Sequence, residues 1–238
     1  MQVGKRIFLQ RNLPQKELIA AYKKLPSSNV ADCMNRTGAM APRIRLMSHP
    51  HEEMCGPAFT VHNRPGDNLT IYAALKYCHE GDVVVIDNEN DNTRAVIGEV
   101  MMTWLRDQRH VAGVVVDGPI RDIDSLSNWD LPIYAVSTTP DGPYKEGPGE
   151  INVPVSCGNV SVNPGDVILG DADGVIKIAL EEASELLPIV QDFHEKDEAK
   201  AASFHDGSGN IDWLDDELKN KNYEIIDDFY RPEIKNYR

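Results

Sequence analysis

The chain has 238 residues, a hydrophobic fraction of 41% and a formal net charge of -14. This charge argues against nucleic acid as a partner, because a phosphate backbone attracts a basic protein face. An anionic substrate would need a locally positive pocket, since the overall field repels it. No run approaches the roughly 20 apolar residues that cross a bilayer, and the N-terminus lacks the apolar core of a signal peptide. We therefore expect a soluble cytoplasmic protein with no membrane partner.

The four cysteines are far apart in the sequence, and none belongs to a C-x-x-C pair. A disulfide framework or a zinc site is therefore not expected. We predict reduced and mostly buried thiols. The cysteines are Cys33, Cys55, Cys78 and Cys157.

The first part of the chain alternates helical and strand patterns. Apolar residues at helical spacing predict helices, and short β-branched runs between turn residues predict strands. Ser27 to Asn29 offer N-caps for the second helix. The predicted elements are a helix over 15–24, a helix from the caps to Met34, a strand over 54–62, a helix over 69–77 and a strand over 83–87.

Residues 97–124, IGEVMMTWLRDQRHVAGVVVDGPIRDID, are the central stretch of the sequence. A helical pattern opens at Gly98 and is followed by the apolar run 114–116, which is typical of a strand buried on both faces. We predict that this strand ends at the turn residues 117–119. Arg121 and Asp122 then follow side by side. A helix start and a strand end are the places where α/β proteins bind small anions and metals.

The second part of the chain is richer in strands and turns, which favours a β-sandwich or barrel core with helices packed outside. A Pro/Gly-rich loop, TTPDGPYKEGPGE, contains Lys145 and is our candidate specificity element. A long helical pattern over 180–202 is predicted to be interrupted at Pro188, and the tail from Ser203 could pack on a neighbouring subunit or fray. The predicted strands cover 131–136, 153–155, 159–162, 167–170 and 175–178.

The chemistry of the central stretch follows from its residue types. Backbone N–H groups in the first helical turn, at Gly98 to Met101, have no intrahelical partner and can bind a carboxylate. Arg121 could grip the same anion with two hydrogen bonds. Asp122 could hold a divalent cation, and a hard oxygen environment favours Mg²⁺ or Mn²⁺. Glu99 would act on the waters of that cation.

Simpler interpretations stay open at this point. Asp122 could be a plain N-cap for the segment 123–126, and an Arg-Asp pair is often a surface ion pair worth about 0–1 kcal/mol. Asp32 lies in the first turn of its helix, where a carboxylate interacts favourably with the helix dipole.

Four segments of the sequence resemble the RraA-like family, which includes the regulator of ribonuclease E activity and the 4-hydroxy-4-methyl-2-oxoglutarate aldolases. The segments are VADCMNRTG near the start, PGDN at 65–68, GEV…GVVVDGPIRD in the central stretch and NPGDVILGDADGV at 163–175. The resemblance implies an α/β fold with a swivelling β/β/α domain over residues 1–202. Residues 203–238 would then form a C-terminal arm that packs on a neighbouring subunit. It also implies a homo-oligomer, a trimer or a dimer of trimers, with active sites between subunits.

The resemblance also implies roles for individual residues. In the aldolase branch an acidic residue precedes an Arg-Asp pair by about twenty positions, and here Glu99 takes the acidic place. The intervening segment is one residue longer than the family pattern, around 108–110. Asp32 falls where a neighbouring subunit supplies an acidic residue. Glu198, in preference to Glu195, falls where another subunit's glutamate meets the metal waters.

The implied activity is a metal-dependent retro-aldol cleavage that releases pyruvate, with oxaloacetate decarboxylation as a side activity. The amides of Val100 and Met101, next to Gly98, would bind a small 2-oxo acid together with Arg121. Asp122 would hold Mg²⁺ or Mn²⁺, which polarises the keto group. A water ordered by Glu99, together with Asp32 and Glu198, would accept the proton of the C4 hydroxyl.

Two alternatives to this activity stay open. Regulators of the ribonuclease E type can lose the Arg-Asp pair, so the intact pair favours the aldolase branch over a non-catalytic regulator that binds an RNA-degradation enzyme. The second alternative is a related enzyme that acts on a different oxo acid, since side chains other than those that bind the enolate decide which oxo acid is the substrate.

Overall fold

The computed structural model describes residues 2–230. Contacts within the chain divide it into two units, the first ending at Glu195 and the second beginning at Lys196. The predicted boundary after residue 202 and the predicted packing of 203–238 on a neighbouring subunit stay predictions. None of the helices in the described residues has both the length and the apolar character needed to cross a membrane.

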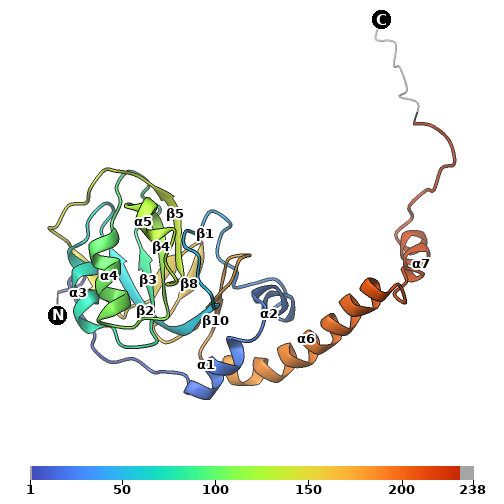
Figure 1. The fold of residues 1–238 in the computed structure, drawn as a ribbon, viewed down its shortest axis with the longest axis horizontal. Helices are drawn as coiled ribbons and strands as arrows, with labels where there is room; N and C mark the ends of the chain where they lie inside the picture. The colour runs from blue at the N-terminus through green and yellow to red at the C-terminus, as the bar shows by residue number, and fades with distance from the viewer. Residues whose placement is uncertain (1, 231–238) are drawn as a thin grey trace, which may run out of the picture. The chain divides into compact units, whose positions relative to one another are not determined.

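A mixed β-sheet forms the centre of the first unit (Figure 1). Its strands β2, β3, β4 and β5 run parallel, and antiparallel strands extend it on either side. Within the described residues the sheet has eight strands in the order β1-β5-β4-β3-β2-β9-β10, and β6 pairs with β2. The strands are β1 (Arg45–Leu46), β2 (Met54–Asn63), β3 (Val83–Asp87), β4 (Gly113–Ile120), β5 (Ile133–Thr138), β6 (Gly149–Ile151), β9 (Val167–Gly170) and β10 (Val175–Ile178), and β7 (Val155–Cys157) pairs separately with β8 (Val160–Val162).

Helices pack outside this sheet, as the strand-rich second half predicts. In Figure 1, α3 and α4 lie side by side over the parallel strands. Ile71, Met102 and Leu105 from these helices are fully buried and share one core cluster with Val84 and Val116 of the sheet. The helices are α1 (Lys16–Tyr22), α2 (Ser27–Cys33), α3 (Leu69–Tyr77), α4 (Glu99–Asp107), α5 (Ile123–Leu126), α6 (Ala183–Asp206) and α7 (Trp213–Asn220).

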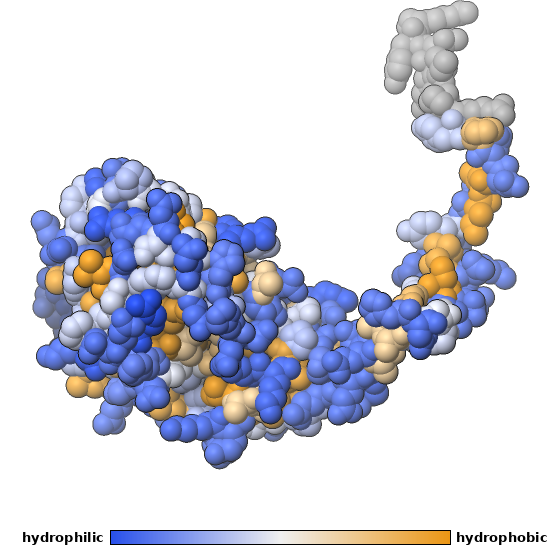
Figure 2. Space-filling view, in the orientation of Figure 1, coloured by the Kyte–Doolittle hydropathy of each residue, from blue (hydrophilic) through white to orange (hydrophobic). Residues whose placement is uncertain are grey.

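The second unit contains the end of α6 and all of α7, and it carries exposed apolar side chains, which appear as orange atoms in Figure 2. Phe204, Ile211 and Trp213 are each 50% exposed or more. No residue of α7 is buried. Among the described residues, the second unit therefore has no hydrophobic core of its own.

Several predicted elements are confirmed with the same bounds, namely α3, β3, β9 and β10. The prediction of mostly buried thiols is also confirmed, because Cys55, Cys78 and Cys157 are buried and Cys33 is partly buried. The sequence did not predict β1 or β6. Both are short strands defined by pairing with a distant strand rather than by their own residue pattern.

The predicted end of the strand at 117–119 is wrong, since β4 continues to Ile120. The register with β5 shifts between Val116 and Pro119, where the proline has no N–H for the ladder. Asp117 is buried there and accepts hydrogen bonds from Arg43 Nη2 at 2.9 Å and from the Gly158 N–H at 2.8 Å. These long-range contacts keep residues 117–119 in β4, although their local sequence indicates a turn.

Two helix predictions also need correction. Pro188 does not interrupt the long helix, because it lies near the start of α6 and removes only a hydrogen bond of its first turns. The second helix begins at Ser27, with Pro26 as its N-cap residue. The Ser27 hydroxyl and N–H donate to Asp171 at 2.7 and 2.8 Å, so a distant carboxylate satisfies this helix end in place of a local serine cap.

Arg11 and Asp82 form an ion pair inside the first unit, with side chains only 5% and 3% exposed. Burial raises the pKa of Asp82, and the Arg11 guanidinium opposes that rise. We expect Arg11→Met to lower the free energy of unfolding at neutral pH by about 3–5 kcal/mol, because it leaves a buried carboxylate without its countercharge. Urea denaturation at pH 7 measures this loss.

The pH dependence of this variant has a definite sign. A carboxyl group whose folded-state pKa is raised favours folding below its unfolded pKa of about 3.9 and loses that contribution as pH rises through the folded value. The destabilisation by Arg11→Met should therefore shrink on acidification, and Arg11→Met with Asp82→Asn should recover stability at pH 7. An equal loss at pH 4 and pH 7 in the single variant would contradict the role of the unpaired charge.

Candidate active site

The start of α4 lies against the end of β4. Ile97 forms a parallel bridge with Ile120, and the Arg121 N–H donates to the Ile97 carbonyl oxygen at 3.2 Å. The chain entering α4 thus runs alongside the last residues of β4 and their continuation. This pairing brings Gly98 next to Arg121 and Asp122, as the central stretch of the sequence predicts.

Asp122 and the first residue of α4 are joined directly. The Oδ2 atom of Asp122 accepts a hydrogen bond from the Glu99 N–H at 2.9 Å and lies 3.6 Å from Nε of Arg121. Among the described residues, no hydrogen bond reaches its other oxygen, Oδ1. The side chains of Arg121 and Asp122 are 46% and 40% exposed, so both can reach a ligand.

The backbone of Asp122 lies in the left-handed region, with φ 63° and ψ 35°. Few non-glycine residues adopt this conformation, although aspartate tolerates it better than most. Asp122 occupies the N-cap position of α5, yet its side chain makes no capping hydrogen bond to that helix. The interpretation of Asp122 as a plain N-cap is therefore wrong, because its carboxylate turns to α4 instead.

Gly98 permits this close approach. A Cβ atom at Gly98 would lie 2.5 Å from Oδ2 of Asp122 and 2.8 Å from Cγ of Arg121. The first of these atoms is held by the Glu99 N–H, so it cannot shift freely. The lack of space for a Cβ atom therefore requires a glycine at this position. The backbone angle does not require one, because a φ of -148° is ordinary extended backbone.

The first turn of α4 presents free backbone donors. The first intrahelical hydrogen bond runs from the Met102 N–H to the Gly98 carbonyl oxygen at 3.0 Å. Within the described chain, the N–H groups of Val100 and Met101 have no acceptor. Both residues line the same pocket as Arg121 and Asp122, so a carboxylate there would meet amide donors and the positive end of the helix dipole.

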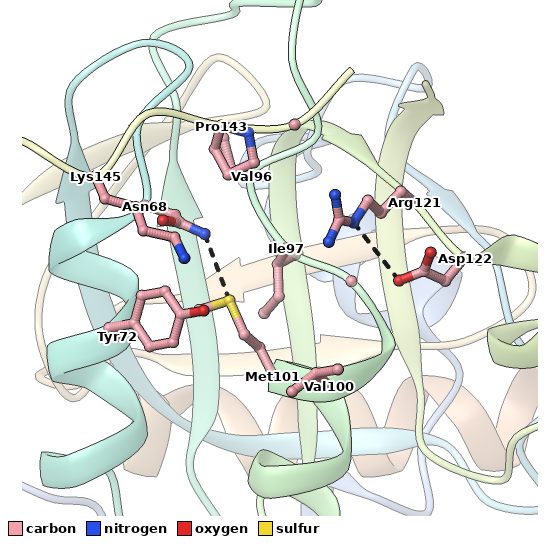
Figure 3. A pocket seen from close by; sticks show the side chains of 12 residues that line it. Asn68, Tyr72, Val96, Ile97, Val100, Met101, Arg121, Asp122, Pro143 and Lys145 are labelled. Atoms are coloured by element: carbon pink, nitrogen blue, oxygen red, sulfur yellow. Dashed lines mark hydrogen bonds and ion pairs between the residues drawn. The ribbon is translucent and has the colours of Figure 1, made fainter. Parts of the chain in front are cut away.

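This pocket has a volume of about 300 Å³. Figure 3 shows Arg121 and Asp122 on one side of it, with Val100 and Met101 from α4 below. Its lining contains two cationic side chains, Arg121 and Lys145, against one carboxylate, which is the locally positive pocket that an anionic substrate needs in an acidic protein. The lining residues are Asn68, Tyr72, Val96, Ile97, Gly98, Val100, Met101, Arg121, Asp122, Gly142, Pro143 and Lys145.

The other predicted acidic residues lie outside this lining. Glu99 accepts a hydrogen bond from the Ser125 hydroxyl at 2.6 Å, which turns its carboxylate toward α5 beside the pocket. Asp32 lies in the last turn of α2, not in its first turn as predicted, so the helix-dipole interpretation is wrong. It pairs with Arg36 at 3.6 Å. Glu198 lies on α6 in the second unit. The predicted supply of Asp32 and Glu198 from neighbouring subunits stays a prediction.

The sequence reasoning missed Asn68 and Tyr72, which line the pocket from the start of α3. The only sequence signal was the PGDN turn that precedes this helix. The loop with Lys145 does line the pocket, through Gly142, Pro143 and Lys145 itself. Its role in specificity stays a prediction.

The predicted extra residue before Arg121 falls in a turn of the structure. Residues 108–110 follow the C-terminal end of α4, and His110 has a positive φ of 51°. This turn lies at the opposite end of α4 from Gly98. A residue added there leaves the start of α4 and the end of β4 in place, because the bridge between Ile97 and Ile120 fixes them independently.

The residues of the pocket fit a divalent cation held mainly by water. No group of three or more His, Cys, Asp or Glu side chains arranged for metal binding occurs in the part of the chain that is described. Mg²⁺ keeps several waters and often binds through one or two carboxylates. The carboxylate of Asp122, in a pocket open to solvent, fits the requirement for such a ligand.

Comparisons with known proteins agree with the fold. Residues 27–177 match the RraA-like family, described as Aldolase/RraA. A relative from Halalkalibacterium halodurans, named provisionally as a 4-hydroxy-4-methyl-2-oxoglutarate aldolase, is 35% identical over 190 residues, which are 80% of this chain and 90% of the relative.

Solved structures show the same fold. An uncharacterised protein from Pseudomonas syringae pv. tomato superposes with a TM-score of 0.73 at 20% identity, over 83% of this chain and 96% of the other. Streptomyces coelicolor RraAS2, described as an unusual member of the RNase ES inhibitor RraA protein family, gives 0.70 at 24% identity, over 79% and 98%. The predicted α/β fold is thereby confirmed, and the chain belongs to the RraA-like family.

Proposed function

We propose that this protein is a divalent-metal-dependent aldolase that cleaves 4-hydroxy-4-methyl-2-oxoglutarate, or a related 4-hydroxy-2-oxo acid, and releases pyruvate. Decarboxylation of oxaloacetate is its side activity. The observation that carries the proposal is the juxtaposition of Arg121 and Asp122 with the open N-terminus of α4 in one pocket. The name of the relative from H. halodurans supports the same reaction class.

In this proposal the protein binds the 2-oxo acid end of the substrate through fixed donors. The N–H groups of Val100 and Met101 donate to the carboxylate, and the guanidinium of Arg121 donates to the carboxylate and the keto oxygen. Because these donors belong to a helix end and a strand end, they are oriented before the substrate arrives. Preorganised donors of this kind stabilise the charge that develops on the keto oxygen.

Asp122 would hold the divalent cation with its carboxylate, whose Oδ2 accepts the Glu99 N–H. When bound, the cation supplies Lewis-acid polarisation of the keto group. Glu99 is held by Ser125 and orients water next to Asp122. Asp32 and Glu198 from neighbouring subunits of a trimer or a dimer of trimers complete the acidic side of the site.

The bond that breaks joins C3 and C4 of the substrate. Its electron pair moves to C3 and, through the C2 carbonyl, to the keto oxygen, which gives the enolate of pyruvate. The C4 hydroxyl loses its proton to water ordered by Glu99, and C4 becomes the carbonyl carbon of the second product. Oxaloacetate gives the same enolate when it loses carbon dioxide, and the enolate is then protonated at C3 in both reactions.

A coupled assay of pyruvate release tests this function. Protein treated with a chelator and then dialysed should release no pyruvate above background, and added Mg²⁺ or Mn²⁺ should restore release from 4-hydroxy-4-methyl-2-oxoglutarate and from oxaloacetate. The absence of pyruvate from both substrates with either metal would contradict the proposal.

A further inference from the structure

The guanidinium of Arg121 is placed by packing rather than by hydrogen bonds. Among the described residues it donates no hydrogen bond, and the Oδ2 atom of Asp122 lies 3.6 Å from its Nε atom. A glycine lies on each side of it. A Cβ atom at Gly98 would lie 3.1 Å from Nε, and a Cβ atom at Gly142 would lie 3.4 Å from Nη1. The orientation of this guanidinium therefore depends on the two backbone segments that contain these glycines.

The two segments are held in different ways. On the Gly98 side, the bridge between Ile97 and Ile120 ties the chain to the end of β4. On the other side, Gly142 lies in the loop of residues 139–148, which connects β5 to β6. A loop is less constrained than a paired strand, so the position of Gly142 depends on the contacts that the loop makes.

Arg94 holds the part of the loop that contains Gly142. Its Nη1 atom donates to the Gly142 carbonyl oxygen at 2.8 Å, and its Cζ atom lies 4.4 Å from the centre of the Tyr144 ring. A hydrogen bond from a charged donor is stronger than one between neutral groups. Among the described residues, no other side chain outside the loop forms a hydrogen bond to residues 140–143. Arg94 is therefore the main side-chain anchor of this part of the loop.

Arg94 reaches the pocket only through this loop. It does not belong to the pocket lining, whereas Gly142 and Pro143 do. Figure 3 shows Pro143 across the pocket from Val100 and Met101, whose N–H groups face the proposed carboxylate. Arg94 can therefore set the position of the loop without touching a substrate bound in the pocket.

We propose that Arg94 is a positioning residue for Arg121. It holds Gly142 against the Arg121 guanidinium, so that the guanidinium is oriented toward the pocket before the substrate binds. The inference rests on the proposed function and deepens it, because it adds a residue from outside the pocket lining. A misplacement of about 1 Å in a group that binds the reacting atoms can cost about a hundredfold in rate, so a small shift of this loop has a measurable effect.

Calorimetric titration with oxalate in the presence of Mg²⁺ tests this inference without turnover. Oxalate is a small planar dianion whose oxygens match the carboxylate and the enolate oxygen of the pyruvate enolate. Arg94→Met should raise the Kd for oxalate about tenfold when Arg121 is present. In an Arg121→Lys background the same substitution should change the Kd by less than about twofold, because the guanidinium on which Arg94 acts is absent.

Arg64→Met is the matched control. Arg64 also stacks on the Tyr144 ring, at 5.9 Å, but it donates to the Gly147 carbonyl oxygen at 3.2 Å, away from Gly142. The substitution removes the same charge from the same loop. It should leave the Kd for oxalate within about twofold of the wild-type value, because it does not release Gly142.

Several outcomes would overturn the inference. These are an equal increase in Kd with Arg94→Met in both backgrounds, an equal increase with Arg64→Met, or no binding of oxalate to the wild-type protein. If oxalate binding depends on Arg94 as expected and no pyruvate is released in the coupled assay, the positioning role stands and the proposed reaction fails. Pyruvate release with equal losses of kcat/KM from Arg94→Met in both backgrounds would reject the positioning role alone.

Discussion

Asp122→Asn is expected to lower kcat/KM for pyruvate release by at least about a hundredfold to a thousandfold, the scale of removing one charge-stabilising group from an active site. Asparagine has nearly the same shape and keeps an oxygen for the Glu99 N–H, so the start of α4 should stay in place. The loss would therefore report the missing negative charge that holds the cation. Steady-state kinetics with both substrates, over a range of Mg²⁺ concentrations, measures it.

The control for this variant is Asp124→Asn, which removes a nearby acid that the proposed site does not use. It should keep its activity within about threefold. A thermal unfolding curve for Asp122→Asn close to that of the wild type would separate lost chemistry from lost structure. Wild-type kinetics in Asp122→Asn at ordinary Mg²⁺ concentrations would remove Asp122 from the metal site.

Arg121→Lys is expected to lower kcat/KM by about a hundredfold although it preserves the charge of the pocket. A guanidinium donates two parallel hydrogen bonds to a carboxylate, whereas an ammonium group acts as a point charge. The loss should appear in both KM and kcat, because the same group binds the carboxylate and stabilises the developing enolate. Steady-state kinetics with oxaloacetate and with the aldol substrate measures both parameters.

Arg106→Lys provides the matched control for Arg121→Lys. Arg106 lies on α4 and pairs with Asp107 at 2.6 Å, outside the lining of the pocket. Its replacement should leave both kinetic parameters close to those of the wild type. If Arg121→Lys were as active as Arg106→Lys, positive charge alone would suffice at position 121. The proposed pair of hydrogen bonds from the guanidinium would then be wrong.

The strongly patterned parts of the fold were predictable from the sequence. The bounds of α3 and β3 follow from local patterns, because turn residues flank an amphipathic run in one case and a β-branched run in the other. The end of β4 was not predictable, since Asp117-Gly118-Pro119 indicates a turn by itself. Its extension depends on Arg43, which lies more than seventy positions earlier in the chain.

One half of the candidate site was predictable from the sequence. Arg121 and Asp122 follow a buried strand, and Gly98 opens a helix, so local patterns suffice to bring them together. The other half depends on the hydrogen bonds between residues 66–68 and 144–146, whose partners are far apart in the sequence. The predicted roles of Asp32 and Glu198 involve neighbouring subunits, which the fold of one chain does not supply.

The left-handed backbone at Asp122 has a consequence for protein engineering. Glycine adopts that conformation without a steric penalty, so a library selected for heat resistance alone would favour Asp122→Gly. A variant selected in this way would lack the carboxylate on which the proposed activity depends. Directed evolution of this scaffold should therefore couple every round of thermal selection to a catalytic screen.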